Sequence, residues 1–475
     1  MSWPAIKTIA ADVQSGKTKA IDLVEQALQS IEDNAEYQAI ISVTADRARK
    51  RANEIDTQIA GGSSVGKLAG VPFIAKDNFL AFGADTTAAS NILKGFDAPY
   101  QATAIERLEN EGAICVAKAN LDAFGHGGST ENSDFFTTKN PHDTERVPGG
   151  SSGGSAAAVV LDMVPFALGT DTGGSSRQPA SFSGCVGYKP TYGLISRSGV
   201  IAMASSTDTI GTLAKTTEDV AYVVDVMAGK DELDSTTIDR DLESYQTDGA
   251  ESLKGKKVGV ITEYMGEGLD PKVKKQIEAS LDKLKEAGAQ IVPISLPSLA
   301  YSLAVYYIVV PAEISSNLSR YDGQRFGYSD SEAKDLESSY TGSRTKGFGA
   351  EAKRRIMTGA YVLSSGYYDA YYNKAQTVRT KLINEFAKAF EQVDFLAGPT
   401  APTTAFKIGE NASDPLQMYL ADVMTVGASL VGIPALVIPA GKENDLPVGL
   451  QLMASQKADR MLLSFGASAQ KIVET

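Results

Sequence analysis

The sequence predicts an α/β protein in which helices cover a β-sheet. Short apolar runs of strand length recur between Gly-rich loops, and helical segments alternate with several of them. Such alternation is typical of sheets whose faces are covered by helices. With 475 residues, 43% of them hydrophobic and 22% charged, the chain has an ordinary globular composition and can bury a large core.

The first sixty residues are predicted to be helical, and we expect residues 1–65 to form a helical N-terminal layer. The Ser15-Gly16 pair offers a break before the second helical stretch. The apolar side chains that recur at helical spacing after this break are Ile21, Val24, Leu28 and Ile31.

From Gly70 onward the pattern changes to short apolar runs that predict strands. One helix among them is well delimited, with Asp270 as its N-cap, Pro271 at its first position and Gly288 as its stop. The candidate strands are Val71 to Ala75, Ala113 to Ala117, Val164 to Leu168, Val258 to Thr262, Ile291 to Ile294, Phe395 to Ala397, Leu436 to Ile438 and Leu450 to Met453.

The domain organisation is predicted to be simple, with one domain over residues 1–475. Residues 300–385 are expected to form a helical insertion that contributes to the substrate pocket. The polar, charged stretch from Lys230 to Lys254 is expected to be a surface excursion rather than a domain boundary.

Composition and charge exclude several classes of protein. Met1 to Asp12 has no apolar core typical of an export signal, and we find no apolar run of membrane-spanning length, so we expect a cytoplasmic protein without membrane contact. A net charge of −13 disfavours a basic surface for nucleic acid. Cys115 lies in a predicted buried strand, and Cys185 has no histidine near it in the chain, so neither a disulfide nor a cysteine nucleophile is expected.

Two Gly/Ser-rich loops are the most unusual feature of the sequence. Gly149 to Ser155 reads Gly-Gly-Ser-Ser-Gly-Gly-Ser, and Gly169 to Ser175 reads Gly-Thr-Asp-Thr-Gly-Gly-Ser. Glycine lets backbone N–H groups approach a ligand closely, so such loops build anion or oxyanion cradles. A pair of flexible turns is the plain alternative. A phosphate-binding loop would need a Gly-Lys-Ser/Thr ending, which neither segment has.

The first loop also matches the G-x-S-x-G nucleophile elbow of α/β-hydrolases, with Ser151 as nucleophile. That elbow needs a strand before the serine and a catalytic histidine after it. Residues 140–148 are turn-like instead, and the only two histidines, His126 and His142, precede Ser151. We expect these histidines to have structural or surface roles. Two scattered histidines and two separated cysteines predict no metal site.

Without a usable histidine, the serine needs another base, and a lysine can serve if burial keeps it neutral near pH 7. Lys76 ends the apolar run from Gly70 to Ala75, so it projects from a strand end, where the active sites of α/β proteins gather. Taken alone, a lysine at such a position is more often a solvated charge.

Together these segments resemble the amidase-signature family over nearly the whole chain. Gly149 to Ala158 and Gly169 to Pro179 are similar to its signature, and Gly70 to Asn78 is similar to its lysine strand. The resemblance implies a single amidase-signature domain with a mixed central β-sheet covered by helices on both sides.

The same resemblance implies a Ser-cisSer-Lys triad. Ser175 is expected to attack the amide carbon, Ser151 to follow a cis peptide and relay the proton, and Lys76 to be the final base. The oxyanion hole is expected to consist of the backbone N–H groups of Thr172, Gly173, Gly174 and Ser175.

Within the family, further motifs resemble the A subunits of glutamyl-tRNA(Gln)/aspartyl-tRNA(Asn) amidotransferases. By position in those motifs, Tyr306, Arg355 and Asp422 are expected to hold free glutamine. An arginine can clamp the α-carboxylate and an aspartate can receive the α-ammonium group. The motifs are Ser129 to Ser133, Glu145 to Pro148, Lys189 to Gly193, Asp234 to Thr236, Ser315 to Leu318, Arg320 to Gly323, Arg354 to Met357 and Ser364 to Tyr372.

This closer resemblance implies partners. A B subunit would phosphorylate misacylated tRNA with ATP and magnesium, and a small C subunit would accompany it. The present chain would need no cofactor and would supply ammonia for converting Glu-tRNA(Gln), Asp-tRNA(Asn) or both. Misacylated tRNA is expected to bind only through the B subunit, which agrees with the acidic charge of this chain.

The sequence departs from the family pattern at three positions that flank the site. Ser176 stands where an aliphatic residue is usual, Ser183 where cysteine is common, and His126 where methionine is frequent. These changes concern the pocket more than the triad. Two alternatives remain open: a freestanding amidase acting on another small amide, which should use glutamine poorly, and a catalytically silent scaffold protein, in which Ser175 would not react with an electrophilic probe.

Overall fold

The central sheet is the frame of the protein. The computed structural model describes residues 2–411 and 414–475, so residues 1, 412 and 413 of the predicted domain lie outside this description. The strands are β1 (Ile40–Val43), β2 (Pro72–Lys76), β3 (Ile114–Ala119), β4 (Phe166–Asp171), β5 (Val186–Lys189), β6 (Thr209–Ala214), β7 (Lys257–Ile261), β8 (Gln290–Ile294), β9 (Phe395–Pro399), β10 (Ala435–Glu443) and β11 (Leu446–Met453).

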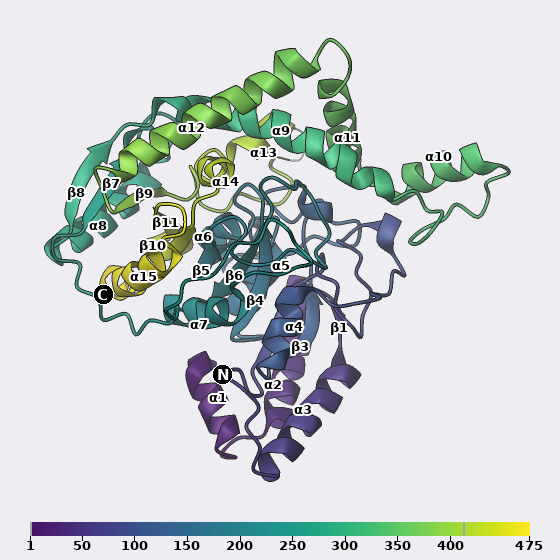
Figure 1. Ribbon diagram of the computed structural model, residues 1–475, viewed down its shortest axis with the longest axis horizontal. Coiled ribbons are helices and arrows are strands. Elements are labelled where there is room, and N and C mark those ends of the chain that lie inside the picture. The colour runs from purple at the N-terminus through teal and green to yellow at the C-terminus, as the bar shows by residue number, and fades with distance from the viewer. Residues whose placement is uncertain (1, 412–413) are drawn as a thin grey trace.

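In the described residues these strands form one 11-stranded sheet in the order β1-β3-β2-β4-β6-β5-β10-β11-β9-β7-β8 (Figure 1). Strand β2 is parallel to both β3 and β4, and β7 is parallel to β8 and β9. The other pairs are antiparallel, so the sheet is mixed. The predicted α/β fold with a mixed sheet is confirmed.

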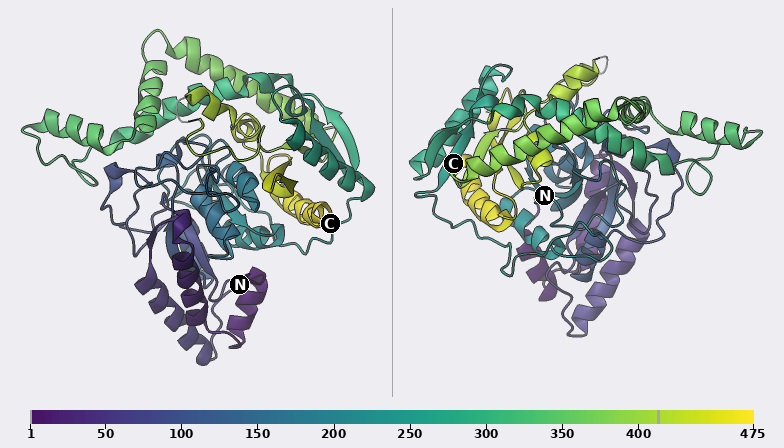
Figure 2. Two further views of the ribbon diagram at one scale, coloured as in Figure 1. Left: turned by 180° about the vertical axis from the view of Figure 1, so that it is seen from behind. Right: turned by 45° about the horizontal axis from the view of Figure 1, so that its top comes forward.

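Helices flank this sheet (Figures 1 and 2). The N-terminal helices α1 to α3 lie at one end of the molecule, and α9 and α12 run along the opposite side, while α10 stands away from the body. The helices are α1 (Ile6–Gln14), α2 (Ala20–Asp33), α3 (Ala45–Ala60), α4 (Thr103–Asn110), α5 (Gly153–Val160), α6 (Arg177–Ser183), α7 (Thr217–Met227), α8 (Pro271–Glu286), α9 (Ser302–Asn317), α10 (Leu336–Gly347), α11 (Ala350–Val362), α12 (Lys374–Phe390), α13 (Pro415–Leu420), α14 (Val426–Val431) and α15 (Asp459–Glu474).

Local sequence signals explain several element ends. The Asp270 side chain accepts the N–H of Lys272, with Pro271 in the first turn, so the N-terminus of α8 is capped as predicted. Helix α1 ends at Gln14, next to the predicted break. The first sixty residues are not entirely helical, however, because β1 pairs antiparallel with β3 at the sheet edge. A four-residue strand forms mainly because it pairs with a neighbouring strand. Its own sequence therefore carries only a weak strand pattern.

One helical stretch differs from the expectation that no apolar run is long enough to span a membrane. Within the described residues, Pro297–Arg320 is long and apolar enough to cross a membrane by length and composition alone. However, 56% of its most apolar window is buried inside the protein, as in a core helix. Helix α9 forms most of this stretch, and Pro311 lies inside it.

Candidate active site

Lys76 lies at the centre of a buried cluster of hydroxyl groups. It is the last residue of β2, and Thr170 is near the end of β4, the parallel neighbour of β2, so both side chains reach the same edge of the sheet. The Lys76 Nζ atom donates to Ser151 Oγ at 2.8 Å, to Ser152 Oγ at 2.9 Å and to Thr170 Oγ1 at 2.9 Å. The lysine is fully buried and is not a solvated charge.

Burial changes the acid–base chemistry of this lysine. Loss of hydration lowers the pKa of Lys76 to about 7, although the carboxylates of Asp122, Asp171 and Asp208 oppose the shift. None of its three hydrogen-bond partners carries a charge. A lysine with this pKa is neutral in a large share of molecules near pH 7, so it can accept a proton.

Ser151 follows a cis peptide bond between Gly150 and Ser151. Gly150 fits tightly, because a Cβ atom there would collide with the Asp122 carboxylate and the Ser129 backbone. The Gly150 N–H donates to Gln178 Oε1 at 2.8 Å, which fixes the loop to α6. Only glycine can occupy this position without moving its neighbours.

Ser175 lies beside this loop but does not complete a hydrogen-bonded chain. The backbone N–H of Ser152 donates to the Ser175 carbonyl oxygen at 3.0 Å, which ties the two Gly/Ser loops together. The Ser175 hydroxyl itself forms no hydrogen bond with any described residue, and the residue is 9% exposed. The structure therefore joins Lys76 to Ser151 and leaves the Ser175 hydroxyl free.

The predicted oxyanion hole is only partly available. The N–H of Gly174 donates to Asp171 Oδ1 at 3.0 Å, so it is engaged within the protein. The N–H groups of Thr172, Gly173 and Ser175 form no hydrogen bonds with the part of the chain that the structure describes. The ring of Tyr306 lies so close to Gly173 that a Cβ there would overlap with it. Three of the four predicted donors are therefore free to bind an oxyanion.

A buried ion pair supports this loop. Arg177 pairs with Asp171 at 2.9 Å, and both side chains are fully buried. Burial alone would raise the pKa of Asp171, but the Arg177 guanidinium holds it below its usual value. Arg177 also donates to Gln451 Oε1 at 2.6 Å and to the Ser429 hydroxyl at 2.9 Å, so the loop is anchored to β11 and α14.

Arg355 is placed to bind an anion. Its Nε donates to Glu351 at 2.8 Å, while its two terminal nitrogens form no hydrogen bond with any described residue. The guanidinium lies 5.3 Å from the ring centre of Tyr307 and 5.5 Å from that of Tyr419. It is 4% exposed. A preorganised, desolvated guanidinium with two free nitrogens suits a bidentate carboxylate.

Asp422 and Tyr306 lie in the same neighbourhood as this arginine. The Tyr307 hydroxyl donates to Asp422 Oδ2 at 3.3 Å, and the rings of Tyr306 and Tyr307 are 5.0 Å apart. Burial raises the pKa of Asp422 to about 7, and Arg355 and the Tyr307 hydroxyl oppose this shift. The three residues predicted to hold substrate therefore converge from α9, α11 and the segment before α14.

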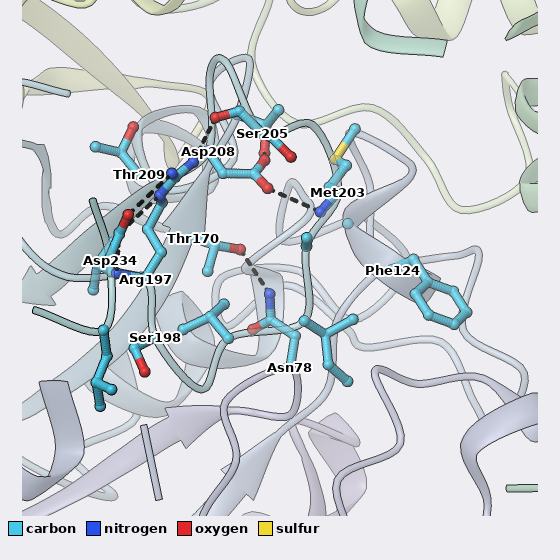
Figure 3. Close-up of a pocket in the computed structure, with 17 residues that line it drawn as sticks. Asn78, Phe124, Thr170, Arg197, Ser198, Met203, Ser205, Asp208, Thr209 and Asp234 are labelled. Carbon is cyan, nitrogen blue, oxygen red and sulfur yellow. Dashed lines mark hydrogen bonds and ion pairs between the residues drawn. The ribbon is translucent and has the colours of Figure 1, made fainter. Parts of the chain in front are cut away.

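A cavity of about 200 Å³ is lined by Asn78, Thr170 and Asp208, among other residues (Figure 3). The Asn78 amide donates to Thr170 Oγ1 at 3.1 Å at its wall. Asp208 accepts the Thr172 hydroxyl at 2.7 Å, which links the cavity to the oxyanion loop. Tyr306, Arg355 and Asp422 do not line this cavity. Lys76 does not line it either, but its hydrogen-bond partner Thr170 does.

Several residues of the site were not predicted from the sequence. Asp122, at the end of a strand-and-turn segment, accepts the N–H groups of Thr130 at 2.8 Å and Asn132 at 3.1 Å and so shapes the loop beside Ser151. Burial raises its pKa to about 6. Ser152, Thr170 and Asp171 lie inside the two Gly/Ser-rich loops, so the sequence indicates that they are near the site. Their contacts, however, depend on the fold.

The two cysteines and the serines Ser176 and Ser183 are all buried. Cys185 is buried and its burial raises its thiol pKa to about 12, which argues against a nucleophilic role, and Cys115 is buried in β3. Ser183 donates to the Pro148 carbonyl oxygen at 2.9 Å, and the buried Ser176 hydroxyl has no partner among the described residues. Those residues contain no group of three metal-binding side chains.

The fold and the site together define an amidase-type α/β protein. Residues 22–463 match the family model described as Amidase, and the chain belongs to this family. It is 47% identical over 472 residues to the A subunit of glutamyl-tRNA(Gln) amidotransferase from Acaryochloris marina, covering 99% of this chain and 98% of that protein. It is 46% identical over 475 residues to the protein of the same name from Halorhodospira halophila, covering 100% and 98%.

A solved structure gives the same picture. The chain is similar to the crystal structure of the A subunit of glutamyl-tRNA(Gln) amidotransferase from Thermotoga maritima, with 40% sequence identity and a TM-score of 0.80. The similarity covers 95% of this chain and 91% of that one.

Proposed function

We propose that this protein hydrolyses glutamine to glutamate and ammonia as the glutaminase subunit of a tRNA-dependent amidotransferase. The observation that carries the proposal is the 2.8 Å contact between the fully buried Lys76 and the Ser151 hydroxyl, beside the free hydroxyl of Ser175. The names of the relatives support the same assignment.

In the proposed mechanism, Ser175 Oγ bonds to the amide carbon of glutamine. Its proton passes to Ser151 Oγ, while Ser151 gives its own proton to neutral Lys76. The N–H groups of Thr172, Gly173 and Ser175 bind the oxyanion. The C–N bond then breaks, the protons return by the same route to the leaving nitrogen, and ammonia departs. Water cleaves the Ser175 ester in the same way and releases glutamate.

The substrate is proposed to be held by the residues around Arg355. The guanidinium pairs with the α-carboxylate, Asp422 receives the α-ammonium group, and Tyr306 closes the space over Gly173. The helical stretch 300–385 thus contributes to the pocket. The pocket thus offers one cation for a carboxylate and one carboxylate for an ammonium group. It suits the amide of a free amino acid better than an aryl or acyl amide, which carries neither charge.

The proposal includes partners and a cytoplasmic location. A B subunit would bind misacylated tRNA and use ATP and magnesium, and a C subunit would complete the complex. This chain would take no part in activating the tRNA, since its net charge is −13 and clustered Lys or Arg is needed to bind phosphates. The ammonia would convert Glu-tRNA(Gln), Asp-tRNA(Asn) or both.

The test compares glutamine with ammonium as nitrogen donor in the assembled complex. Ser175→Ala should abolish glutamine-dependent transamidation and leave ammonium-dependent transamidation at the wild-type rate, because ammonium bypasses the step assigned to this chain. Loss of both activities in a folded complex would contradict this division of labour. A wild-type protein that prefers aryl or acyl amides to glutamine would identify a freestanding amidase instead.

A further inference from the structure

Glu351 joins three side chains at the proposed glutamine site. Its Oε1 atom accepts the Arg355 Nε–H at 2.8 Å and the Tyr419 hydroxyl at 3.1 Å. Its Oε2 atom pairs with Arg354. Glu351 and the two arginines lie on α11, whereas Tyr419 lies on α13. This carboxylate therefore connects two elements that are far apart in the sequence.

The contacts of Glu351 differ from those of an ordinary pair on a helix surface. Glu351 lies in the first turn of α11, where an acidic side chain favours the helix, and i,i+4 pairs with arginine are common. Such pairs are usually exposed to solvent and contribute little to stability. Here the side chains of Glu351 and Arg355 are only 11% and 4% exposed. A nearly buried carboxylate with three partners fixes the positions of those partners.

The contact with Glu351 leaves one edge of the Arg355 guanidinium free. A guanidinium can bind a carboxylate with two parallel hydrogen bonds, either through both terminal nitrogens or through Nε and one of them. Glu351 occupies Nε, and the two terminal nitrogens have no partner among the described residues. The described chain encloses both ring nitrogens of His126, but it does not enclose these two terminal nitrogens. Arg355 can therefore bind substrate through its terminal edge, whereas His126 cannot contact substrate.

The same carboxylate is linked to the proposed ammonium site. The Tyr419 ring stacks on the Tyr307 ring at 3.9 Å, and the Tyr307 hydroxyl donates to Asp422 Oδ2 at 3.3 Å. The contacts thus run without a break from Arg355 through Glu351, Tyr419 and Tyr307 to Asp422. In an α-amino acid the carboxylate and the ammonium group are bonded to one carbon, so the groups that bind them must keep a fixed separation.

We propose that Glu351 is a positioning residue, which turns both terminal nitrogens of Arg355 toward the α-carboxylate of glutamine and holds them at the correct distance from Asp422. The inference rests on the proposed function and narrows its substrate class to amides that carry a carboxylate and an ammonium group on one carbon. Glu351 acts through Arg355 and does not itself touch substrate. Its side-chain length matters for this role, and its charge matters less.

The test compares Glu351→Asp with Glu351→Gln in the assembled complex. The first variant keeps the charge, but its side chain is one methylene shorter and cannot hold Arg355 and Tyr419 at their present positions. The second keeps the length and an acceptor oxygen but has no charge. The KM for glutamine should rise at least about tenfold in Glu351→Asp and less than about threefold in Glu351→Gln, with kcat within about twofold of wild type in both.

Two carboxylate-free reagents separate positioning from a packing role. The first is 4-aminobutanamide, which is glutamine without its α-carboxylate, and its kcat/KM should stay within about twofold of wild type in Glu351→Asp. The second is a neutral phosphonate probe, which reports whether the triad is intact. Its rate of labelling Ser175 should not change in either variant.

A double variant tests whether Glu351 acts through Arg355. In the Arg355→Met background, Glu351→Asp should lower kcat/KM for glutamine by less than about twofold, because no guanidinium remains to be oriented. Arg354→Met is the matched control, since Arg354 pairs with the other oxygen of Glu351 and 48% of its side chain is exposed. The control should leave KM for glutamine within about twofold of wild type.

Three outcomes would overturn the proposal. A KM increase in Glu351→Gln at least as large as that in Glu351→Asp would show that Glu351 only balances charge. Equal losses with glutamine and 4-aminobutanamide would indicate a general packing role, and additive losses in the double variant would show that Glu351 does not act through Arg355. A wild-type complex that does not hydrolyse glutamine would overturn the proposed function as well, whereas an active wild type with unaffected Glu351 variants would overturn only this inference.

Discussion

The backbone N–H of Gly174 donates to the carboxylate of Asp171 at 3.0 Å. Because the same carboxylate pairs with Arg177, the loop carrying Ser175 is held by a buried ion pair rather than by the substrate. Gly174 has a φ of +139°, and a Cβ there would also overlap with the Thr425 hydroxyl. The conformation that frees three neighbouring N–H groups is therefore built into the protein before substrate binds.

Asp171→Asn should destabilise the protein strongly. Breaking one side of a buried pair leaves the Arg177 charge uncompensated, which costs about 3–5 kcal/mol. The free energy of unfolding in urea measures this loss. Glu25→Gln is the control, because Glu25 and Arg49 form an ion pair with 47% and 44% of their side chains exposed, and such pairs contribute little. Equal effects of the two substitutions would contradict the supporting role of Asp171.

The rate of glutamine hydrolysis should rise with pH through the pKa of Lys76, about 7. Only the neutral amine accepts a proton, and its fraction grows about tenfold per pH unit below the pKa and levels off above it. The kcat at saturating glutamine, measured from about pH 5.5 to about pH 9, checks this, whereas kcat/KM would also follow the ionisation of Asp422. A rate that falls over this range would assign the opposite protonation state to the base.

Lys76→Arg should be nearly as damaging as Lys76→Met. The first variant retains the charge and the second removes it, but neither restores a base, since a guanidinium keeps its proton at any working pH. We expect kcat to fall about 10²–10⁴-fold in each variant, the range for loss of a general base. An active Lys76→Arg protein would make Lys76 an electrostatic group and place the base elsewhere.

Ser175→Ala and Ser151→Ala should differ in kind. The first removes the nucleophile and should leave no measurable hydrolysis, while the second removes the relay and should lower kcat greatly in a folded protein. An electrophilic amide or phosphonate probe followed by mass spectrometry should label Ser175 in wild type and nothing in Ser175→Ala. Retention of more than a few percent of activity by Ser175→Ala would reassign the nucleophile.

Tyr307→Phe should weaken glutamine binding in a pH-dependent way. The Tyr307 hydroxyl favours the ionised form of Asp422, so its removal should raise the pKa of that carboxyl above about 7. Because binding of an ammonium group needs the ionised carboxylate, KM should rise more at about pH 7 than at about pH 8.5. Tyr419→Phe is the neighbouring control, since its hydroxyl donates to Glu351 at 3.1 Å and not to Asp422. A KM increase equal at both pH values would exclude this linkage.

The strands with long apolar runs were predictable, and those with weak local patterns were not. The candidate at Val71 to Ala75 corresponds to β2, and Leu450 to Met453 lies within β11. Strand β6, which reads Thr-Ile-Gly-Thr-Leu-Ala, mixes hydroxyls and glycine with apolar residues and was missed. It is a strand because β4 and β5 pair with it on both sides, and that information is absent from its own residues.

The candidate site likewise has features that the sequence predicts and features that only the folded protein shows. The proximity of Lys76 to Ser151 followed from strand ends and from family motifs, and the structure brings them together. The engagement of Gly174 by Asp171 and the unpaired ring of His126 depend on contacts among loops far apart in sequence. No local pattern encodes which N–H is already occupied, so this part required the folded protein.

The place of β10 and β11 in the sheet has a consequence during synthesis. These strands are among the last to be made, yet they fill the middle of the sheet between β5 and β9. At about 5–20 residues per second, β5 waits on the order of ten seconds or more for its partner to leave the ribosome. During that time β5 presents an unpaired edge that can pair with other chains. A premature stop just before Ala435 would leave two separate sheets, one ending at β5 and one at β9, each with an unpaired edge strand. Such truncated chains should therefore aggregate.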